Sequence, residues 1–206
     1  MNAGLVASVV GGLLVGVVAC APVPATVQTA GAAPAKARPA SATPLKHAKA
    51  DTEFMQGMIG HHAQALEMTA LLYTRTNRPD MKLLAERIDV SQGDEIKMMK
   101  RWLELRGETV PNEHAHHMGG ALMPGMLTME QMDRLGAAKG DEFDRLFLEA
   151  MIYHHLGALK MVADLFAVPG AAQNGEIFDF ASHVDGDQKM EILRMQGMLK
   201  TIKGGL

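Results

Sequence analysis

The chain has 206 residues, with 20 Lys and Arg against 23 Asp and Glu, and carries a formal net charge of −3. This length accommodates one domain and an appended segment. From residue 51 onward, 16 basic residues stand against 23 acidic ones, and such an acidic domain excludes nucleic acid as a natural partner. An acidic domain is more compatible with cations. The same part holds 16 of the 17 methionines and eight of the nine histidines, and this enrichment requires an explanation.

Residues 1–20 are predicted to be an export signal. Residues 3–19 are small and aliphatic, and Cys20, the single cysteine, follows Val-Val-Ala as in a lipobox. We therefore expect Cys20 to be lipidated and to tether an exported protein to a membrane. No Lys or Arg precedes Lys36, although signal peptides have a positive first region. Cleavage to a soluble periplasmic or extracellular protein and retention as an N-terminal membrane anchor are therefore alternatives.

Residues 21–50 are predicted to be a disordered tether. They are rich in Ala, Pro and Thr and contain no acidic or aromatic residue, so they cannot bury enough apolar surface to offset the entropy lost on ordering. His47 lies in this segment, and we expect it to be solvated. The folded domain is predicted to span residues 51–206.

Apolar residues at helical spacing predict four long helices, over residues 52–75, 80–106, 141–167 and 176–202. Pro79, Gly107 and Pro169-Gly170 separate them. Residues 108–140 form a long connector, in which Thr128 and Gln131 are spaced as a capping box for a short helix over 128–138. Strand patterns are absent. We predict an all-α fold: an antiparallel four-helix bundle of two hairpins, 51–107 and 141–203, with a long crossover.

The two hairpins are predicted to be copies of one unit. Phe, Met, Ile, His, His, Ala, Leu and Met recur at matching positions in residues 54–68 and 147–161, 93 residues apart. A second match, with a separation of 96 residues, pairs Gln92, Glu95, Ile96 and Met99 with Gln188, Glu191, Ile192 and Met195. Each copy therefore presents a face of paired histidines and methionine.

Adjacent histidines on a helix point about 100° apart, so one pair is not a two-ligand chelate. We expect His62 and His155 in the core and His61 and His154 at its margin. Each pair is preceded within one turn by a methionine, Met58 or Met151. Imidazole with thioether is a soft ligand set suited to copper, and thioether favours Cu(I) and, by chemical similarity, Ag(I). The alternative is that the methionines fill core space and the histidines are structural.

Two further groups are candidates. The connector carries three histidines and a methionine within five residues, and His-rich short tracts bind metals; the predicted ligands of this labile site are His114, His116, His117 and Met118. Glu95 and Glu191 lie on the core-facing side of their helices, where a buried carboxylate needs a partner. We predict that they orient the core imidazoles from outside the metal's ligand shell, with a structural buried pair as the alternative.

The pattern Phe-x3-Met-Ile-x-His-His-x2-Ala-x2-Met, present twice, resembles the domain-of-unknown-function 305 (DUF305) family of exported bacterial proteins. Gln92-x2-Glu95-Ile96-x2-Met99 and the segment 125–132 resemble it too. The resemblance covers about residues 51–203 and implies a ferritin-like four-helix fold and, for some members, periplasmic copper binding and copper tolerance. The ligands that it implies are Met58, His61, His62, Met68, Met151, His154, His155 and Met161.

The favoured hypothesis is a cell-envelope metal-binding protein without enzymatic turnover, acting in metal buffering or tolerance. Cu(I) is the favoured ion, with Ag(I) and Zn(II) as alternatives, and a homo-oligomer and an envelope metal-transfer partner are compatible with it. A second hypothesis is a metal-free interaction or sensor module whose histidines are structural or pH-responsive. A third is a ferritin-like di-metal oxidase, but that chemistry uses Glu-x-x-His motifs, and the sequence contains none.

Overall fold

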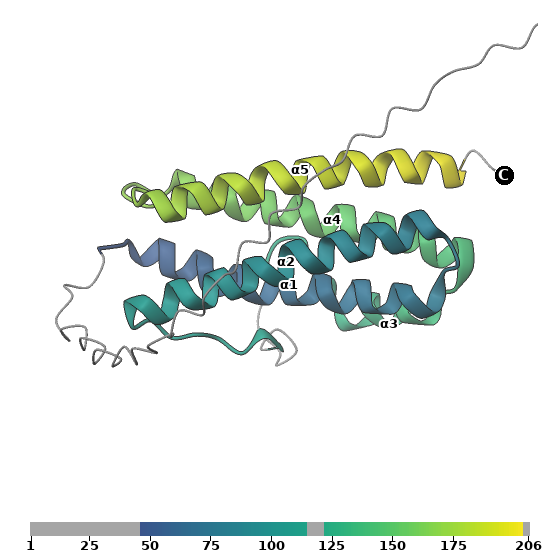
Figure 1. Cartoon of the computed structure of the whole chain (residues 1–206), viewed down its shortest axis with the longest axis horizontal. Coiled ribbons are helices and arrows are strands. Elements are labelled where there is room, and N and C mark those ends of the chain that lie inside the picture. Colours follow the sequence, from purple (N-terminus) through teal and green to yellow (C-terminus); the bar gives the residue numbers. More distant parts are fainter. Residues whose placement is uncertain (1–45, 115–121, 204–206) are drawn as a thin grey trace, which may run out of the picture. The chain divides into compact units, whose positions relative to one another are not determined.

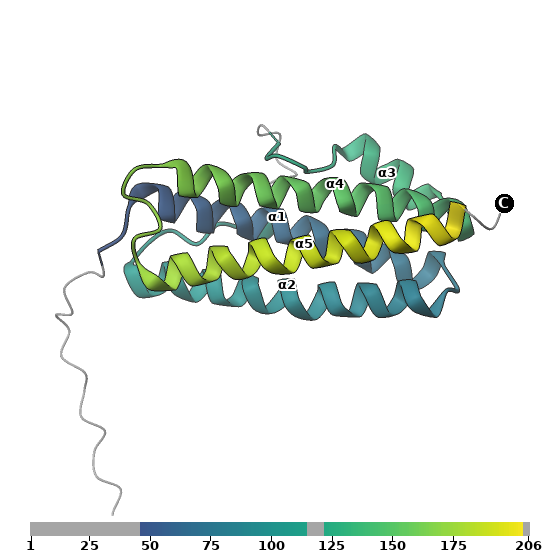
Figure 2. The same ribbon diagram turned by 90° about the horizontal axis from the view of Figure 1, so that it is seen from above.

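The structure is a computed structural model that describes residues 46–114 and 122–203. Within these residues the chain forms five helices and no strand: α1 (Lys49–Arg75), α2 (Pro79–Arg106), α3 (Met129–Ala137), α4 (Gly140–Ala167) and α5 (Gly175–Lys203). Helix α1 packs along α2 and α4, and α5 packs along α4 (Figures 1 and 2). The predicted antiparallel four-helix bundle is confirmed, with α3 lying on the crossover between its hairpins.

The helix ends follow from local chemistry. Pro79 opens α2, where its missing N–H is no loss, and Gly107 closes it in a left-handed conformation with φ of 70°. The Thr128 hydroxyl accepts from the backbone N–H of Gln131, and the Gln131 side chain accepts from the backbone N–H of Thr128. This reciprocal pair is the capping box that the sequence predicts for α3.

The folded domain includes residues that the sequence assigns to the tether. Helix α1 begins at Lys49, two residues before the expected domain start. His47 packs against the bundle: its Nε2 lies 2.8 Å from Oε1 of Glu108, and its ring meets the edge of Trp102 at 5.1 Å between centroids. The expectation of a solvated His47 is therefore wrong, because a composition-based tether prediction does not register contacts with distant helices.

The predicted export signal, Cys20 and the tether up to residue 45 lie outside the described residues. Among the helices of residues 46–114 and 122–203, none is both long enough and apolar enough to cross a membrane.

The core of the bundle is divided in two. The first apolar cluster lies between the N-terminal part of α1, the C-terminal parts of α2 and α4 and the start of α5, and includes Phe54, Met58, Met99, Trp102, Val162 and Phe180. The second fills the other end and includes Met68, Leu72, Leu84, Phe143, Phe147 and Met151. Between them lies a set of polar residues, here called the polar layer: His61, His62, Gln92, Glu95, His154, His155, Gln188 and Glu191.

The connector is fixed against α1 and α4 at the level of the polar layer. The Gln64 side chain donates to the Leu127 carbonyl at 2.9 Å and accepts from the Leu127 N–H at 2.8 Å. Gly157 lies so close to the connector that a Cβ placed there would be 1.9 Å from the Pro124 oxygen. The connector therefore covers this side of the layer through backbone contacts with both helices.

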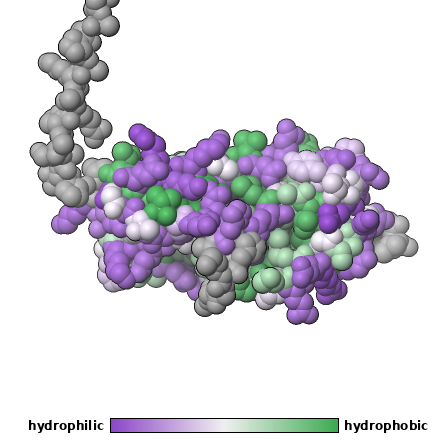
Figure 3. Space-filling model, turned by 90° about the horizontal axis from the view of Figure 1, so that it is seen from below, coloured by the Kyte–Doolittle hydropathy of each residue, from purple (hydrophilic) through white to green (hydrophobic). Residues whose placement is uncertain are grey.

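Exposed large apolar side chains are distributed over the long helices, including Tyr73, Val90, Met98, Tyr153, Leu156, Phe178 and Met190. On the face seen in Figure 3, hydrophobic residues form separate patches among hydrophilic ones. Isolated apolar residues of this kind are normal on a protein surface.

Candidate metal centre

Four imidazoles meet at the middle of the bundle. His61 and His62 come from α1 and His154 and His155 from α4, and each is at most 1% exposed. The rings of His61 and His154 contact each other, with centroids 3.9 Å apart and ring planes at 40°. The expectation that these two histidines lie at the core margin is wrong, because the close packing of α1 against α4 brings both margins inside.

His62 and His155 are each paired with a glutamate of their own hairpin. Nε2 of His62 lies 2.8 Å from Oε2 of Glu95 on α2, and Nε2 of His155 lies 2.6 Å from Oε2 of Glu191 on α5. The two glutamate side chains are 12% and 18% exposed, so the carboxylates lie between the buried rings and the surface. This arrangement holds each ring in a fixed orientation.

The hydrogen-bond acceptors decide which ring nitrogens are available. A carboxylate or a carbonyl only accepts, so Nε2 of His62 and His155 donates to its glutamate, and Nε2 of His61 donates to the Pro124 carbonyl at 2.9 Å. In a neutral imidazole the other nitrogen then carries a lone pair. Among the described residues, these Nδ1 atoms are buried without a hydrogen-bond partner, and both ring nitrogens of His154 are too.

Burial keeps the central pair of imidazoles uncharged. Burial lowers the pKa of His61 to about 3, and the nearby His62 adds to this effect, while the hydrogen bond that His61 donates to the Pro124 carbonyl opposes it. Burial likewise lowers the pKa of His154 well below its ordinary value, and the adjacent His61 lowers it further. Neutral imidazole is the form that binds metals, so both rings are in a ligating form near neutral pH.

Two glutamines complete the polar layer, and the sequence analysis assigned them no role. Gln92 and Gln188 are 1% and 3% exposed, and among the described residues both amide atoms of Gln92 and Oε1 of Gln188 lack a hydrogen-bond partner. An unsatisfied buried polar atom is costly, so it requires an explanation. Their recurrence beside Glu95 and Glu191 was the signal available in the sequence.

The side of the layer that faces α2 and α5 is acidic. Burial raises the pKa of Asp187, and the negative charges of Glu95 and Glu191 raise it further. Three carboxylates therefore lie near one another on this side, whereas the connector covers the other.

The predicted methionine ligands are distributed on both sides of the layer. Met58 belongs to the first apolar cluster and Met151 to the second, so the two fully buried thioethers flank the imidazoles from opposite ends. Met99 and Met195 are also fully buried, each one helical turn after the layer's glutamate on its own helix. The sequence analysis matched this second pair but did not include it among the ligands.

The remaining predicted ligands lie apart from this group. Met68 is fully buried in the second cluster, whereas Met161 is half-buried at the edge of the first. The His114 side chain is 62% exposed, and its Nδ1 lies 2.9 Å from Oε1 of Glu67. The other predicted ligands of that tract, His116, His117 and Met118, lie outside the described residues.

The layer does not present a complete set of nitrogen and oxygen ligands. In residues 46–114 and 122–203, no group of three or more His, Cys, Asp or Glu could hold a metal ion as placed. The buried lone pairs fit a metal chemically, but a complete site requires a thioether among the ligands or a movement of the rings.

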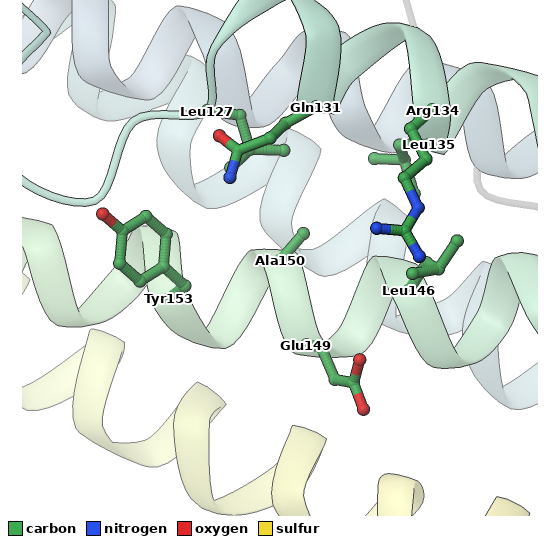
Figure 4. Close-up of a pocket in the computed structure, with 8 residues that line it drawn as sticks. All are labelled: Leu127, Gln131, Arg134, Leu135, Leu146, Glu149, Ala150 and Tyr153. Carbon is green, nitrogen blue, oxygen red and sulfur yellow. The ribbon is translucent and has the colours of Figure 1, made fainter.

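A separate cavity of about 230 Å³ lies between α3 and α4. Figure 4 shows its lining, with the Arg134 side chain reaching from α3 towards α4 and Tyr153 at its other end. No histidine or methionine lines it, so it does not contribute to the candidate centre.

A helical bundle with a buried layer of imidazoles and carboxylates defines the structural class of this protein. The chain belongs to the family of the domain of unknown function DUF305. The family's model matches residues 51–199. Protein L153 of Acanthamoeba polyphaga mimivirus is 39% identical over 56 residues, which are 27% of this chain. The match spans 37% of that relative's length.

Solved structures share the fold. A DUF305 protein of Streptomyces coelicolor that is described as secreted is 29% identical with a TM-score of 0.66, over 75% of this chain and 94% of that one. A DUF305 fragment from Deinococcus radiodurans is 27% identical, also with a TM-score of 0.66, over 76% and 99%. CopM in its Cu(II)-bound form is 27% identical with a TM-score of 0.60, over 73% and 96%, and its Cu(I)- and Ag-bound forms match as well.

Proposed function

We propose that this protein binds copper in the polar layer, with Cu(I) as the favoured ion, and buffers or detoxifies the metal outside the cytoplasm. The observation that carries the proposal is the set of buried, unpartnered ring nitrogens on four neighbouring histidines. These nitrogens have no hydrogen-bond partner, in a place where unpaired polar atoms are costly.

The surrounding groups support a soft ion. Buried thioethers flank the imidazoles on both sides, through Met58 and Met151. Thioether prefers Cu(I) and Ag(I), whereas imidazole also accepts Zn(II) and Cu(II). Glu95 and Glu191 would orient His62 and His155 from behind, as carboxylates do for metal-bound histidines. CopM, which shares the fold, was solved with copper and with silver.

The proposal includes export. A structural relative is described as secreted, and the first twenty residues have the pattern of an export signal ending in Cys20. Lipidation of Cys20 would hold the metal-binding domain at the membrane surface. Mass spectrometry of the protein purified from membranes tests this directly, since a diacylated N-terminal cysteine has a characteristic added mass.

The decisive experiment is a competition titration of the full chain with Cu(I) against a chromophoric chelator, run alongside Zn(II). We expect tight Cu(I) binding that weakens when His61, His62, His154 and His155 are replaced together by Gln. Circular dichroism must first show that this variant keeps its helical content. The matched control is His183→Gln, an exposed histidine on α5 outside the layer. Equal Cu(I) affinity of the wild type and the four-histidine variant would refute the proposal.

A metal-free interaction or sensor module is the second candidate. The absence of a preassembled group of three His, Cys, Asp or Glu ligands in the described residues favours it. In that case the layer would be a polar core that selects one packing of the helices, as buried polar residues do in some bundles. It predicts no copper in the protein isolated from copper-supplemented cells.

A further inference from the structure

A further cavity lies between α2 and α5, away from the polar layer. The C-terminal end of α2 and the N-terminal end of α5 lie at the same end of the bundle (Figures 1 and 2). Residues of both helices line a cavity of about 590 Å³ there, and no residue of the polar layer is among them. A volume of this size is typical of a site for a small molecule.

Apolar side chains form most of the cavity wall. Met55 on α1, Trp102 on α2 and Phe180 on α5 are at most 5% exposed, whereas Met98 and Leu105, also on α2, are about half exposed. A ligand in the cavity would therefore contact the edge of the buried core and cover two apolar side chains that now face water. Both effects favour a ligand with an apolar body.

Two buried N–H groups at this cavity have no acceptor. Trp102 and Arg106 both line it, and Nε1 of Trp102 and Nε of Arg106 lack a hydrogen-bond partner among the described residues. The rest of the Arg106 guanidinium is engaged, because it donates to the Trp102 carbonyl and to the Glu176 carboxylate. It also lies over the Trp102 ring, 4.1 Å from the ring centroid. A buried donor without an acceptor is costly, so these two groups favour a ligand with an oxygen acceptor.

The rim of the cavity adds a positive charge. Arg101 lines it and forms no ion pair within residues 46–114 and 122–203, whereas Lys97 and Arg106 are each paired with a carboxylate. Asp179, on the α5 side, is exposed, so water can satisfy its carboxylate. The available guanidinium favours an anionic oxygen, because Arg binds carboxylates through two parallel N–H groups.

The second hairpin does not repeat these groups. With the separation of 96 residues that relates α2 to α5, Trp102 corresponds to Met198, Arg106 to Ile202 and Arg101 to Gly197. None of these three side chains offers an N–H donor or a charge. The duplicated bundle therefore folds without such groups, and the need to build a core does not explain their presence at one end.

We infer that this cavity binds an amphipathic carboxylate, with its apolar body against Met55 and Phe180 and its head group at Trp102, Arg106 and Arg101. The inference goes beyond the proposed function, because it involves no metal ion and no residue of the polar layer.

Trp102 is the only tryptophan in the chain, so its fluorescence and its indole N–H signal in NMR report on the cavity directly. Titration of the full chain with decanoate, kept below the concentration at which it forms micelles, should change the fluorescence to saturation. The indole N–H signal should move downfield as the group donates to the carboxylate. Decanol has the same chain length and a neutral head, and it should bind about tenfold more weakly, because hydrogen bonds to charged groups are stronger.

Arg101→Gln separates the head group from the apolar body. It should weaken decanoate binding by about tenfold and leave decanol binding unchanged, since only the anion uses the guanidinium. The matched control is Arg87→Gln, an exposed arginine on α2 that does not line the cavity, and it should bind both molecules like the wild type. Three results would each overturn the inference: no saturable fluorescence change, an indole signal that does not move, or equal decanoate affinity of Arg101→Gln and the wild type.

The outcome is independent of the buried layer. The variant with Gln at His61, His62, His154 and His155 should bind decanoate like the wild type, whereas Arg101→Gln should bind Cu(I) like the wild type. Failure of the inference and failure of the proposed function therefore give different results.

Discussion

The two helical hairpins are alike inside the bundle and different on its surface. Inside, each hairpin pairs a histidine with a glutamate, at 2.8 Å for His62 and Glu95 and at 2.6 Å for His155 and Glu191. Outside, the matching positions Gln64 and Gly157 both contact the connector, the first through two hydrogen bonds and the second through its lack of a side chain.

This difference has a geometric cause. The inner pairs form within each hairpin, so duplication of a hairpin duplicates the pair. The connector occurs once, and it must cover α1 and α4 from one direction, so the two repeats must meet it with different side chains. The asymmetry of the surface follows from this single covering segment.

The largest expected effect concerns the two central histidines, one from each repeat. Their pKa values are lowered in the folded state, that of His61 from 6.5 to about 3. As the pH falls below about 6.5, the unfolded chain therefore binds protons that the folded one does not. The free energy of unfolding of the metal-free protein should fall by up to about 1.4 kcal/mol per pH unit for each histidine.

Urea denaturation of the full chain from about pH 7 to about pH 4 measures this slope. His61→Gln and His154→Gln should each make it shallower, and equal changes would show that both repeats contribute alike. A slope that neither central substitution alters contradicts the assignment to buried neutral imidazoles.

Gly157→Ala should destabilise the protein through its contact with the connector. The added Cβ would lie 1.9 Å from the Pro124 oxygen, and backbone atoms cannot move aside as a flexible side chain can. We expect a loss of about 3 kcal/mol in the free energy of unfolding, typical of severe overpacking. Gly197→Ala is the control, since no atom lies within 4 Å of its added Cβ, and it should be neutral or slightly stabilising.

Gln64→Ala tests how the first hairpin positions the connector. It removes both hydrogen bonds to the Leu127 backbone and leaves these buried groups unpaired. We expect a loss of about 2 kcal/mol, measured by denaturant unfolding, because an unsatisfied buried group carries the full desolvation penalty. Hydrogen exchange should also increase in residues 122–128. Unchanged exchange there would show that Gly157 alone positions the connector.

The smallest expected effect separates one metal site from two. Glu95→Gln and Glu191→Gln each weaken the acceptor behind one imidazole, and such outer partners change metal affinity by about tenfold or more. Similar losses of Cu(I) affinity in both variants would show that both repeats serve the bound ion. A loss in only one would assign the ion to that hairpin. Full affinity in both would contradict the orienting role of the glutamates.

Helical periodicity and the repeated motif were enough to predict the four long helices, the capping box at Thr128 and the two hairpins. They also placed His62, His155, Glu95 and Glu191 towards the core, because the direction of a side chain on a helix follows from its position in the turn. The same reasoning put His61 and His154 at the margin. It failed there because the extent of a core depends on how closely the next helix packs.

By itself, the sequence determined which residues form helices and which faces are apolar, since these depend on interactions within about four residues along the chain. It also showed that one hairpin repeats the other, because the matching residues can be compared directly. Only the tertiary structure decided that His61 contacts His154, that Pro124 accepts the hydrogen bond from His61, and that His47 packs on Trp102. Each of these contacts joins residues that are far apart in the chain. Their positions are fixed by the packing of the whole bundle, which no local pattern specifies.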